Sequence, residues 1–383
     1  MKTTSIIEIS RDSLESNINF LRDYIGKDVK FSSVVKGNAY GHGIEEFVPL
    51  AERAGIDHFS VFSVDEAYRV CRMKSSETDV MIMGWVDDEA IEWVINNNIE
   101  FYVFELNRLI AAINMARKLD KKARVHIEVE TGMNRTGFKQ KTLQTVVNLI
   151  RDNPEHIVLR GLCTHFAGAE SIANHVRVQK QYKRFIKIYN WFKTKSLKPE
   201  IIHAASSAAA MTYPKTRMDM VRVGILQYGY WPSSETFIHY ISHQREKTDP
   251  LMRVISWKTR IMSIKNVSQG EFISYGTSYL ATENKKIAII PTGYAHGFSR
   301  SLSNSGRVLI NGERVATIGM VNMNMLIADV TLLPDADVGD EVVLIGEQGD
   351  HTISVSSFTQ MSDQLNYELL TRLPANTTRL VTS

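Results

Sequence analysis

The segment SSVVKGNAYGHG, residues 32–43, places a lysine where chemistry explains it better than solubility does. An apolar run leads into Lys36, which opens a turn with three glycines, and Tyr40 follows four residues later. Burial at the end of a strand disfavours the charged form of a lysine and lowers its pKa. We therefore expect Lys36 to act as a nucleophile or as a base.

Other chemically capable side chains also follow apolar runs, each at the point where the run ends. They are Glu130 and Arg135 in ETGMNRTGF, His165 in CTHFAG, His203, Ser206 and Ser207 in HAASSAA, and Arg222, Gly224, Ile225 and Tyr228 in VRVGILQYG. Each has an ordinary structural explanation when it is taken alone, such as a helix cap for a serine or a buried ion pair for an arginine. Their coincidence at the ends of the runs favours a shared site.

A phosphate group fits part of this set. Hydroxyl and backbone N–H groups around the small residues Ala205, Ser206, Ser207, Gly224 and Ile225 are suited to binding a phosphate. A reactive lysine across from a phosphate site is typical of pyridoxal 5'-phosphate, which binds covalently to lysine. The sequence therefore predicts this cofactor, attached to Lys36.

Eight short apolar or β-branched runs occur in the first 240 residues, and most are separated by segments with helical spacing. The runs cover residues 29–35, 58–64, 79–85, 99–105, 123–130, 157–163, 200–205 and 220–226. Near-continuous apolar strands that alternate with helices indicate an eight-stranded (β/α)8 TIM-type barrel. Catalytic groups of such barrels lie at the carboxyl ends of the strands, where the residues above are found.

The pattern changes after residue 240, where β runs follow one another through short turns. Asn311-Gly312 predicts a hairpin turn, and residues 354–373 predict one helix near the end. The fold class is therefore α/β plus β. We predict a barrel domain over residues 1–240, with first residues that can instead join the β domain, and a mainly β domain over 241–383.

Composition disfavours several kinds of partner. With 45 basic and 42 acidic side chains the formal net charge is +3, which argues against a dedicated nucleic-acid surface. The basic residues of 180–195 recur at helical spacing and indicate the solvated face of one helix. Cys71 and Cys163 match no metal-binding spacing, so we predict no metal. No segment reads as a signal peptide or a membrane span, and we expect a cytoplasmic location.

Eight motifs resemble, in the same order, those of the alanine racemase family, from about residue 5 to the end of the chain. The motifs are VVKGNAYGHG, TGMNRTGF, THFAGAE, HAASSAA, VRVGILQYG, ISYGTSY, PTGYAHGF and LNYELLTRLP. The resemblance implies a homodimer that uses pyridoxal phosphate and two bases to interconvert L- and D-alanine, the latter a peptidoglycan precursor. Lys36 matches the cofactor lysine and first base. Tyr275 matches the second base, which the β domain supplies to the active site of the partner subunit.

The resemblance also assigns the remaining site residues. The phosphate contacts of the family are matched by Tyr40, Ser207, Gly224, Ile225 and Tyr367. His165 matches the imidazole that stacks on the cofactor ring, and Arg222 matches the group that faces the ring nitrogen. Arg135 and the Met323 backbone match the groups that hold the substrate carboxylate, and Tyr294 matches part of an aromatic entrance. Since a guanidinium cannot give up its proton, we expect Arg222 to leave the ring nitrogen unprotonated.

The chain departs from the family pattern at several positions. Glu128 replaces a lysine that is carbamylated in many members, and we expect it to supply the negative charge that orients Arg135. Asn324 replaces an aspartate, His296 makes GYAHG of the usual GYADG, and Met320 replaces an entrance arginine opposite Glu170. These changes leave the reaction type intact, but they open the choice of substrate to serine or a larger amino acid.

Two other functions compete with racemisation. A decarboxylase on the same barrel-plus-β plan usually has a glycine-rich phosphate loop and a C-terminal catalytic cysteine, whereas both cysteines here precede residue 170. A protein that binds pyridoxal phosphate without turnover has no use for a second base. The presence of both Lys36 and Tyr275 therefore argues against it.

Overall fold

The computed structural model describes residues 4–362 and 366–383. The chain divides into two compact units, each described below by itself. The barrel unit contains Ser13–Lys36 and Val48–Met252, and the β unit contains Met1–Asp12, Gly37–Phe47 and Arg253–Ser383. The segment that follows Lys36 therefore belongs to the β unit although it lies early in the sequence.

Eight parallel strands form the sheet of the barrel unit, in the order β8-β7-β6-β5-β4-β3-β2-β9. They are β2 (Lys30–Val34), β3 (His58–Val61), β4 (Asp79–Ile82), β5 (Glu100–Val103), β6 (Ala123–Glu128), β7 (Ile157–Cys163), β8 (Ile201–His203) and β9 (Met220–Val223). Each falls within one of the eight apolar runs, so the predicted barrel is confirmed. A bridge between Ser206 and Arg222 joins the two ends of the sheet, where the Arg222 N–H donates to the Ala205 carbonyl at 3.1 Å.

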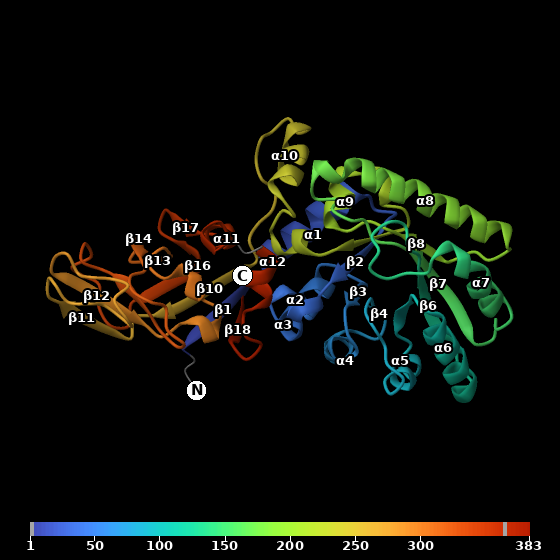
Figure 1. The fold of residues 1–383 in the computed structure, drawn as a ribbon, viewed down its shortest axis with the longest axis horizontal. Coiled ribbons are helices and arrows are strands. Elements are labelled where there is room, and N and C mark those ends of the chain that lie inside the picture. The colour runs from blue at the N-terminus through green and yellow to red at the C-terminus, as the bar shows by residue number, and fades with distance from the viewer. Residues whose placement is uncertain (1–3, 363–365) are drawn as a thin grey trace. The chain divides into compact units, whose positions relative to one another are not determined.

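Helices connect most of the barrel strands, and α6, α7 and α8 lie outside β6, β7 and β8 (Figure 1). The helices of this part of the chain are α1 (Arg11–Ile25), α3 (Ile44–Arg53), α4 (Val64–Met73), α5 (Ile91–Asn96), α6 (Leu106–Leu119), α7 (Leu143–Arg151), α8 (His175–Thr194), α9 (Ser207–Thr212) and α10 (Ser234–Ser242). In α7 the apolar positions 143, 146, 147 and 150 are buried, which is the spacing of one helical face.

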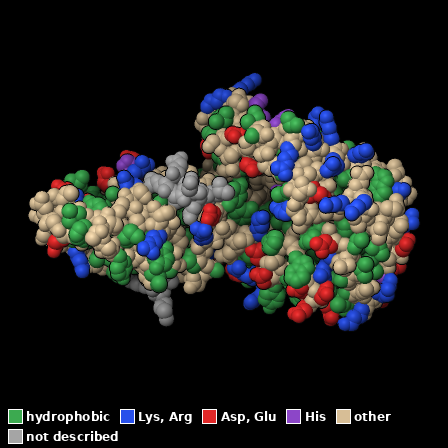
Figure 2. Space-filling view, viewed as in Figure 1, with side chains coloured by type: hydrophobic (Ala, Val, Ile, Leu, Met, Phe, Trp, Pro, Cys, Tyr) green, Lys and Arg blue, Asp and Glu red, His purple; other side chains and the backbone are tan. Residues whose placement is uncertain are grey.

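The basic run at 180–195 forms most of α8, as predicted. Its buried face contains Val178, Gln181 and Phe185 among others, and lysine and arginine side chains cover the surface where α8 lies (Figure 2). No helix in the two described stretches of the chain is both long and apolar enough to span a bilayer.

Two sheets form the β unit. One has the order β14-β13-β16-β10-β1-β18, with β17 paired to β16, and the other has the order β11-β12-β15. The strands are β1 (Ser5–Ser10), β10 (Ile255–Arg260), β11 (Ser263–Val267), β12 (Lys285–Ile290), β13 (Arg307–Ile310), β14 (Glu313–Ala316), β15 (Leu326–Asp329), β16 (Glu341–Gln348), β17 (His351–Ile353) and β18 (Thr378–Thr382). The first residues of the chain thus pair with β10 and β18.

The predicted hairpin is confirmed. Asn311 and Gly312 have φ of 50° and 81° and join the antiparallel pair β13 and β14. Positive φ at both central positions is the geometry of the turn that Asn-Gly favours. The region of the predicted last helix contains α11 (Val355–Ser362) and α12 (Asn366–Thr371), and residues 363–365 lie outside the described part.

The segment after Lys36 is a left-handed helical turn, α2 (Lys36–Tyr40). Residues 37, 38, 39 and 40 have φ of 62°, 55°, 52° and 50°, although only the first is glycine. Side chains disfavour this conformation, by roughly 1–2 kcal/mol per residue, so tertiary contacts must hold it. Arg379 in β18 donates to the Gly41 carbonyl from Nε at 3.1 Å and from Nη2 at 2.8 Å.

A Cβ at Gly41 would lie 2.0 Å from the carbonyl oxygen of Leu370 in α12. We predict that Gly41→Ala lowers the free energy of unfolding of the cofactor-free protein by more than Gly270→Ala does. Gly270 is the matched control, because its φ of 88° is close to the 81° of Gly41 but no atom lies within 4 Å of its Cβ position. The control reports the strain of positive φ alone, and Gly41→Ala adds an overpacking cost of about 1–3 kcal/mol. Urea unfolding measures both, and equal losses would contradict the proposed contact.

Candidate active site

Lys36 lies two residues after the end of β2, at the carboxyl edge of the barrel. It is exposed to solvent in the single chain, yet enough protein surrounds its amine that desolvation lowers its pKa below 10.5. The charge of Arg135 lowers this pKa further, Glu66 raises it, and Arg222 lowers it. A larger neutral fraction of the amine near neutral pH is what a base or nucleophile requires.

The Arg222 guanidinium in β9 is almost fully buried and donates to several barrel residues. Its Nη1 donates to His203 Nδ1 at 2.6 Å, and its Nη2 donates to the Thr164 and Ala204 carbonyls, each at 3.0 Å. Nη2 also lies 3.3 Å from His165 Nδ1. The Nε–H and the second Nη1–H of Arg222 donate to no described residue, so two donors of a fixed guanidinium are left for a ligand.

His165 follows β7, and its proton position is dictated by its neighbour. Because a guanidinium only donates, a proton on His165 Nδ1 would face the Arg222 Nη2–H groups at 3.3 Å, and this repulsion places the proton of the neutral ring on Nε2. Burial, and then the charges of Arg222, Arg135 and Lys36, lower the pKa of His165 to about 3. Gln181, buried in α8, donates to the His165 carbonyl at 3.0 Å and fixes this loop. His165 is therefore a neutral Nε2–H donor at any working pH.

The residues predicted to bind phosphate in the barrel unit lie together. The hydroxyl oxygen of Ser207, the first residue of α9, accepts from the Gly224 N–H at 2.9 Å, which leaves its own proton to donate elsewhere. Ile225 begins the 3₁₀ turn η4 (Ile225–Tyr228), so its N–H has no acceptor within the turn. These are the donors that an anion requires.

Arg135 lies on an exposed loop that closes on β6. The Phe138 N–H donates to the Glu128 carbonyl at 2.8 Å, and the Glu130 carboxylate accepts from the Asn134 N–H at 2.7 Å. Glu128 makes no ion pair with Arg135 within the described residues, which differs from the expectation that it orients this arginine. Burial raises the pKa of Glu128, and a hydrogen bond from Thr136 and the charge of Arg135 oppose that rise.

The β unit carries the other predicted residues. Tyr275, Tyr294 and Met323 line an open pocket of about 620 Å³ together with Met320 and Asn324, two of the positions that depart from the family pattern. Tyr275 is 73% exposed in the single chain. The backbone N–H of Met323 donates to no described residue and is open to an incoming acceptor.

Tyr40 and Tyr367, also in the β unit, pack against each other with ring centroids 5.9 Å apart. His296 has a local role: its Nδ1 accepts from the Gly293 N–H at 3.2 Å and caps the turn η5 (Tyr294–His296). Burial lowers the pKa of His296, which keeps the ring neutral for this bond. The side chain of Glu170 is exposed.

The donor set of the barrel unit fits pyridoxal phosphate. Ser207, Gly224 and Ile225 offer hydroxyl and amide groups to a phosphate. Arg222 retains unused N–H donors that suit a ring nitrogen. Lys36 offers an amine with a lowered pKa. No cluster of three or more His, Cys, Asp or Glu that could hold a metal occurs in the described stretches.

Sequence reasoning misses Glu100 and His126, which lie behind this set together with His203, a residue that the sequence places only at the end of a strand. All three are fully buried. The available signal was a titratable side chain inside an otherwise apolar run, IEFYVFE or ARVHIEVE.

A parallel barrel with a desolvated lysine at its carboxyl edge, joined to a separate β unit, defines a lysine-dependent barrel enzyme. Two family models match the chain: residues 9–232 match "Alanine racemase, N-terminal domain" and residues 254–381 match "Alanine racemase, C-terminal domain". The chain belongs to the alanine racemase family, whose members are isomerases.

Relatives named alanine racemase match over nearly their whole length. The protein of Leptospira interrogans serogroup Icterohaemorrhagiae serovar copenhageni is 33% identical and covers 100% of this chain and 97% of its own length. That of Halothermothrix orenii is 35% identical, with 95% of this chain and 93% of its own length covered. That of Methanococcus maripaludis is 33% identical, with 97% of both chains covered.

Solved structures of alanine racemases also align with nearly the whole chain. Alanine racemase of Clostridium difficile 630 aligns with a TM-score of 0.89 at 29% identity, covering 100% of this chain and 96% of that one. Alanine racemase from Bacillus anthracis with bound L-Ala-P aligns with a TM-score of 0.90 at 30% identity and the same coverage.

The lowered pKa of Lys36 can be tested on the cofactor-free protein by acylation at a series of pH values, with modified lysines read by mass spectrometry. We predict that Lys36 becomes reactive at lower pH than Lys285, whose pKa is raised by hydrogen bonds to Glu283 and Asp329. Arg135→Gln should shift the Lys36 profile to higher pH, because it removes a positive charge that disfavours the ammonium. An unchanged profile, or a shift to lower pH, would contradict the electrostatic assignment.

Proposed function

We propose that this protein is a pyridoxal-phosphate-dependent racemase that interconverts L- and D-alanine, with Lys36 and Tyr275 as the two bases. The observation that carries the proposal is the position of Lys36 at the carboxyl edge of the barrel, in a chain of the alanine racemase family. Desolvation and the charges of Arg135 and Arg222 lower its pKa there. A decarboxylase or a silent binding protein is not favoured by any contact in either unit.

Eight residues would hold the cofactor. They are Lys36, Tyr40, His165, Ser207, Arg222, Gly224, Ile225 and Tyr367. When bound, pyridoxal phosphate supplies an electron sink that makes the α-proton of an amino acid removable. Everything else in the reaction is the work of the protein: anchoring the phosphate, orienting the substrate and moving protons.

Arg222 would set the strength of that sink. Its guanidinium would face the ring nitrogen and could not release a proton to it, because arginine stays protonated at any working pH. The cofactor would then be a weaker electron sink than one with a protonated ring, which would favour return of the α-proton over side reactions such as transamination.

Two bases on opposite faces of the α-carbon would exchange the proton. Lys36 Nζ takes or returns it on one face, and Tyr275 Oη does so on the other. Both groups titrate near pH 10 when free, so both need tuning. For Lys36 the tuning is desolvation and nearby charge. For Tyr275 we propose the His165 Nε2–H, because a fixed neutral donor stabilises a phenolate without competing for its proton.

Arg135 and the Met323 N–H would bind the substrate carboxylate, and Tyr294, with Tyr275 and Tyr367, would line the entrance. We further propose a homodimer in which each β unit supplies Tyr275 to the partner subunit. The support is its 73% exposure, which is high for a catalytic tyrosine and expected if a second chain covers it. We also propose a cytoplasmic location, as the sequence suggests, and a role in peptidoglycan precursor supply, which the family resemblance implies.

Proton NMR in D2O tests the reaction directly. With added pyridoxal phosphate, we expect the α-proton signal of L-alanine to disappear as D-alanine forms. Chiral chromatography measures the D-alanine. Serine and larger amino acids serve as parallel substrates, because Met320 and Asn324 alter the predicted pocket. Exchange confined to another amino acid would reassign the substrate, and exchange with none would refute the racemase.

Mixed dimers test the shared site. We predict that Lys36→Ala and Tyr275→Phe homodimers each lose racemisation by at least a hundredfold, because each lacks one base. Mixing the two chains should restore activity, since half of the sites in a mixed dimer contain both Lys36 and Tyr275. The wild-type protein diluted and mixed in the same way is the control. No recovery from chains that demonstrably exchange subunits would exclude donation of Tyr275 across the dimer.

A further inference from the structure

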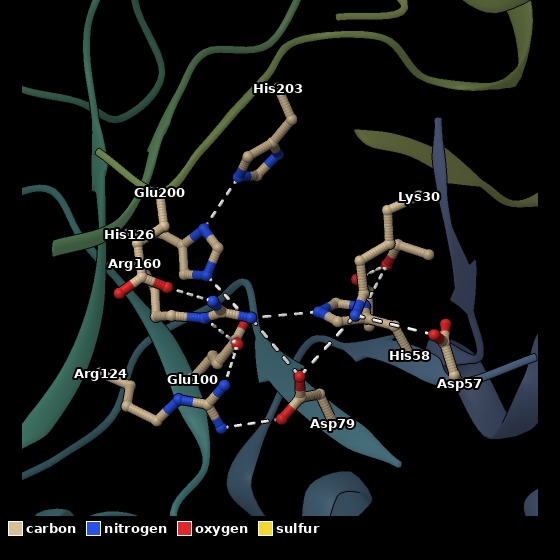
Figure 3. A network of polar contacts seen from close by, with 12 residues as sticks. Lys30, Asp57, His58, Asp79, Glu100, Arg124, His126, Arg160, Glu200 and His203 are labelled. Atoms are coloured by element: carbon tan, nitrogen blue, oxygen red, sulfur yellow. Dashed lines mark hydrogen bonds and ion pairs between the residues drawn. The ribbon is translucent and has the colours of Figure 1, made fainter. Parts of the chain in front are cut away.

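A chain of buried polar side chains crosses the interior of the barrel, where such folds usually pack apolar layers (Figure 3). Its core members are fully buried or nearly so. They are Ser32, His58, Glu100, His126 and His203, each 0% exposed, and Arg222, 4% exposed. Glu100 begins β5 and His203 ends β8, so the chain runs from the amino edge of the barrel to its carboxyl edge.

The hydrogen bonds of this chain can point in only one direction. Arg222 Nη1 lies 2.6 Å from His203 Nδ1, and because a guanidinium cannot accept, that nitrogen carries no proton. The neutral His203 ring must hold its proton on Nε2, which lies 2.9 Å from His126 Nδ1. His126 Nδ1 is therefore an acceptor as well. The His126 proton lies on Nε2, 2.8 Å from the Glu100 carboxylate.

The charge state of both rings follows from the same contacts. A doubly protonated His203 would direct an N–H against the Arg222 guanidinium, and a doubly protonated His126 would direct one against the His203 N–H. Burial also lowers the pKa of each of these histidines. Both rings are therefore neutral, and each carries its proton on Nε2.

Glu100 is a suitable end for the chain because it only accepts. Its Oε2 accepts from His126 at 2.8 Å and from His58 at 3.2 Å, and its Oε1 accepts from Arg124 and Arg160, each at 2.7 Å. Burial raises the pKa of Glu100, but the hydrogen bonds from the two histidines outweigh it, so the pKa falls below its ordinary value and the group stays ionised.

We propose that Glu100 is a positioning residue for Arg222: the one-way chain Arg222→His203→His126→Glu100 fixes the tautomers of both imidazoles and holds the guanidinium toward the cofactor ring. A carboxylate at the far end polarises each hydrogen bond in turn, and so strengthens His203 as an acceptor for Arg222. The effect on the cofactor rests on the proposed function. The tautomers themselves do not.

The first test needs neither cofactor nor substitution of Glu100. Nitrogen-15 NMR of histidine-labelled, cofactor-free protein reports which ring nitrogen carries the proton, with signals assigned by His126→Gln and His203→Gln. We expect both rings to be singly protonated on Nε2 from pH 6 to pH 9. A proton on Nδ1 of either ring, or a charged ring in that range, would overturn the proposal.

The second test separates positioning from general support. Glu100→Gln removes the terminal charge, and Asp79→Asn is the matched control, because Asp79 also contacts Arg124 at 2.8 Å and Arg160 at 3.5 Å but lies outside the histidine chain. We expect Glu100→Gln to shift the His126 and His203 signals and to raise pyruvate release per racemisation about tenfold. Glu100→Asp should restore part of the wild-type behaviour. Asp79→Asn should change neither.

Equal effects of Glu100→Gln and Asp79→Asn would overturn the proposal, since they would show a purely structural role for the ion-pair cluster. If Glu100→Gln fails to fold, the wild-type tautomers still decide the matter. Nε2–H tautomers in a protein that racemises nothing would refute the proposed function while the chain of hydrogen bonds stands. Other tautomers in an active racemase would refute only the role of Glu100.

Discussion

The guanidinium of Arg222 donates hydrogen bonds and cannot accept one, and the chemistry of the barrel is organised around that asymmetry. On one side it determines the tautomers of His165 and His203, because both must present an unprotonated nitrogen to it. On the other it retains unused N–H donors for a ligand. A lysine in its place would also be a cation, but a rotating ammonium with a pKa that burial lowers cannot impose fixed tautomers on two rings.

The interior of the barrel is unusually polar behind Arg222, whose guanidinium is almost fully buried. A buried guanidinium needs a counter-charge, and leaving one unpaired costs several kcal/mol. The buried carboxylate of Glu128 interacts electrostatically with Arg222. Glu100 lies at the opposite edge of the sheet, beyond two imidazoles, and is itself paired with Arg124 and Arg160.

The β unit contributes through conformation as well as through side chains. Five consecutive residues after Lys36, 37 to 41, adopt positive φ, and Arg379 and Leu370 from the far end of the chain enclose the same loop. Strain of this kind persists only where tertiary contacts enforce it, and it occurs commonly at functional sites. Gly41 of VVKGNAYGHG is therefore required for steric reasons, because any side chain there would collide with the backbone of Leu370.

Sequence alone determined the eight barrel strands, the change to β structure, the Asn311-Gly312 hairpin, the family, and the candidate roles of Lys36, Arg222 and Tyr275. These rest on periodicity, turn chemistry and motif order, which are local properties of the chain. Only the tertiary structure showed that Glu100, His126, His203 and Arg222 are connected by consecutive hydrogen bonds, because these residues come from four different strands. It also showed that Glu128 does not pair with Arg135 and that His296 caps its own turn. Hydrogen-bond direction depends on which atoms face each other across a barrel, and no local pattern encodes that.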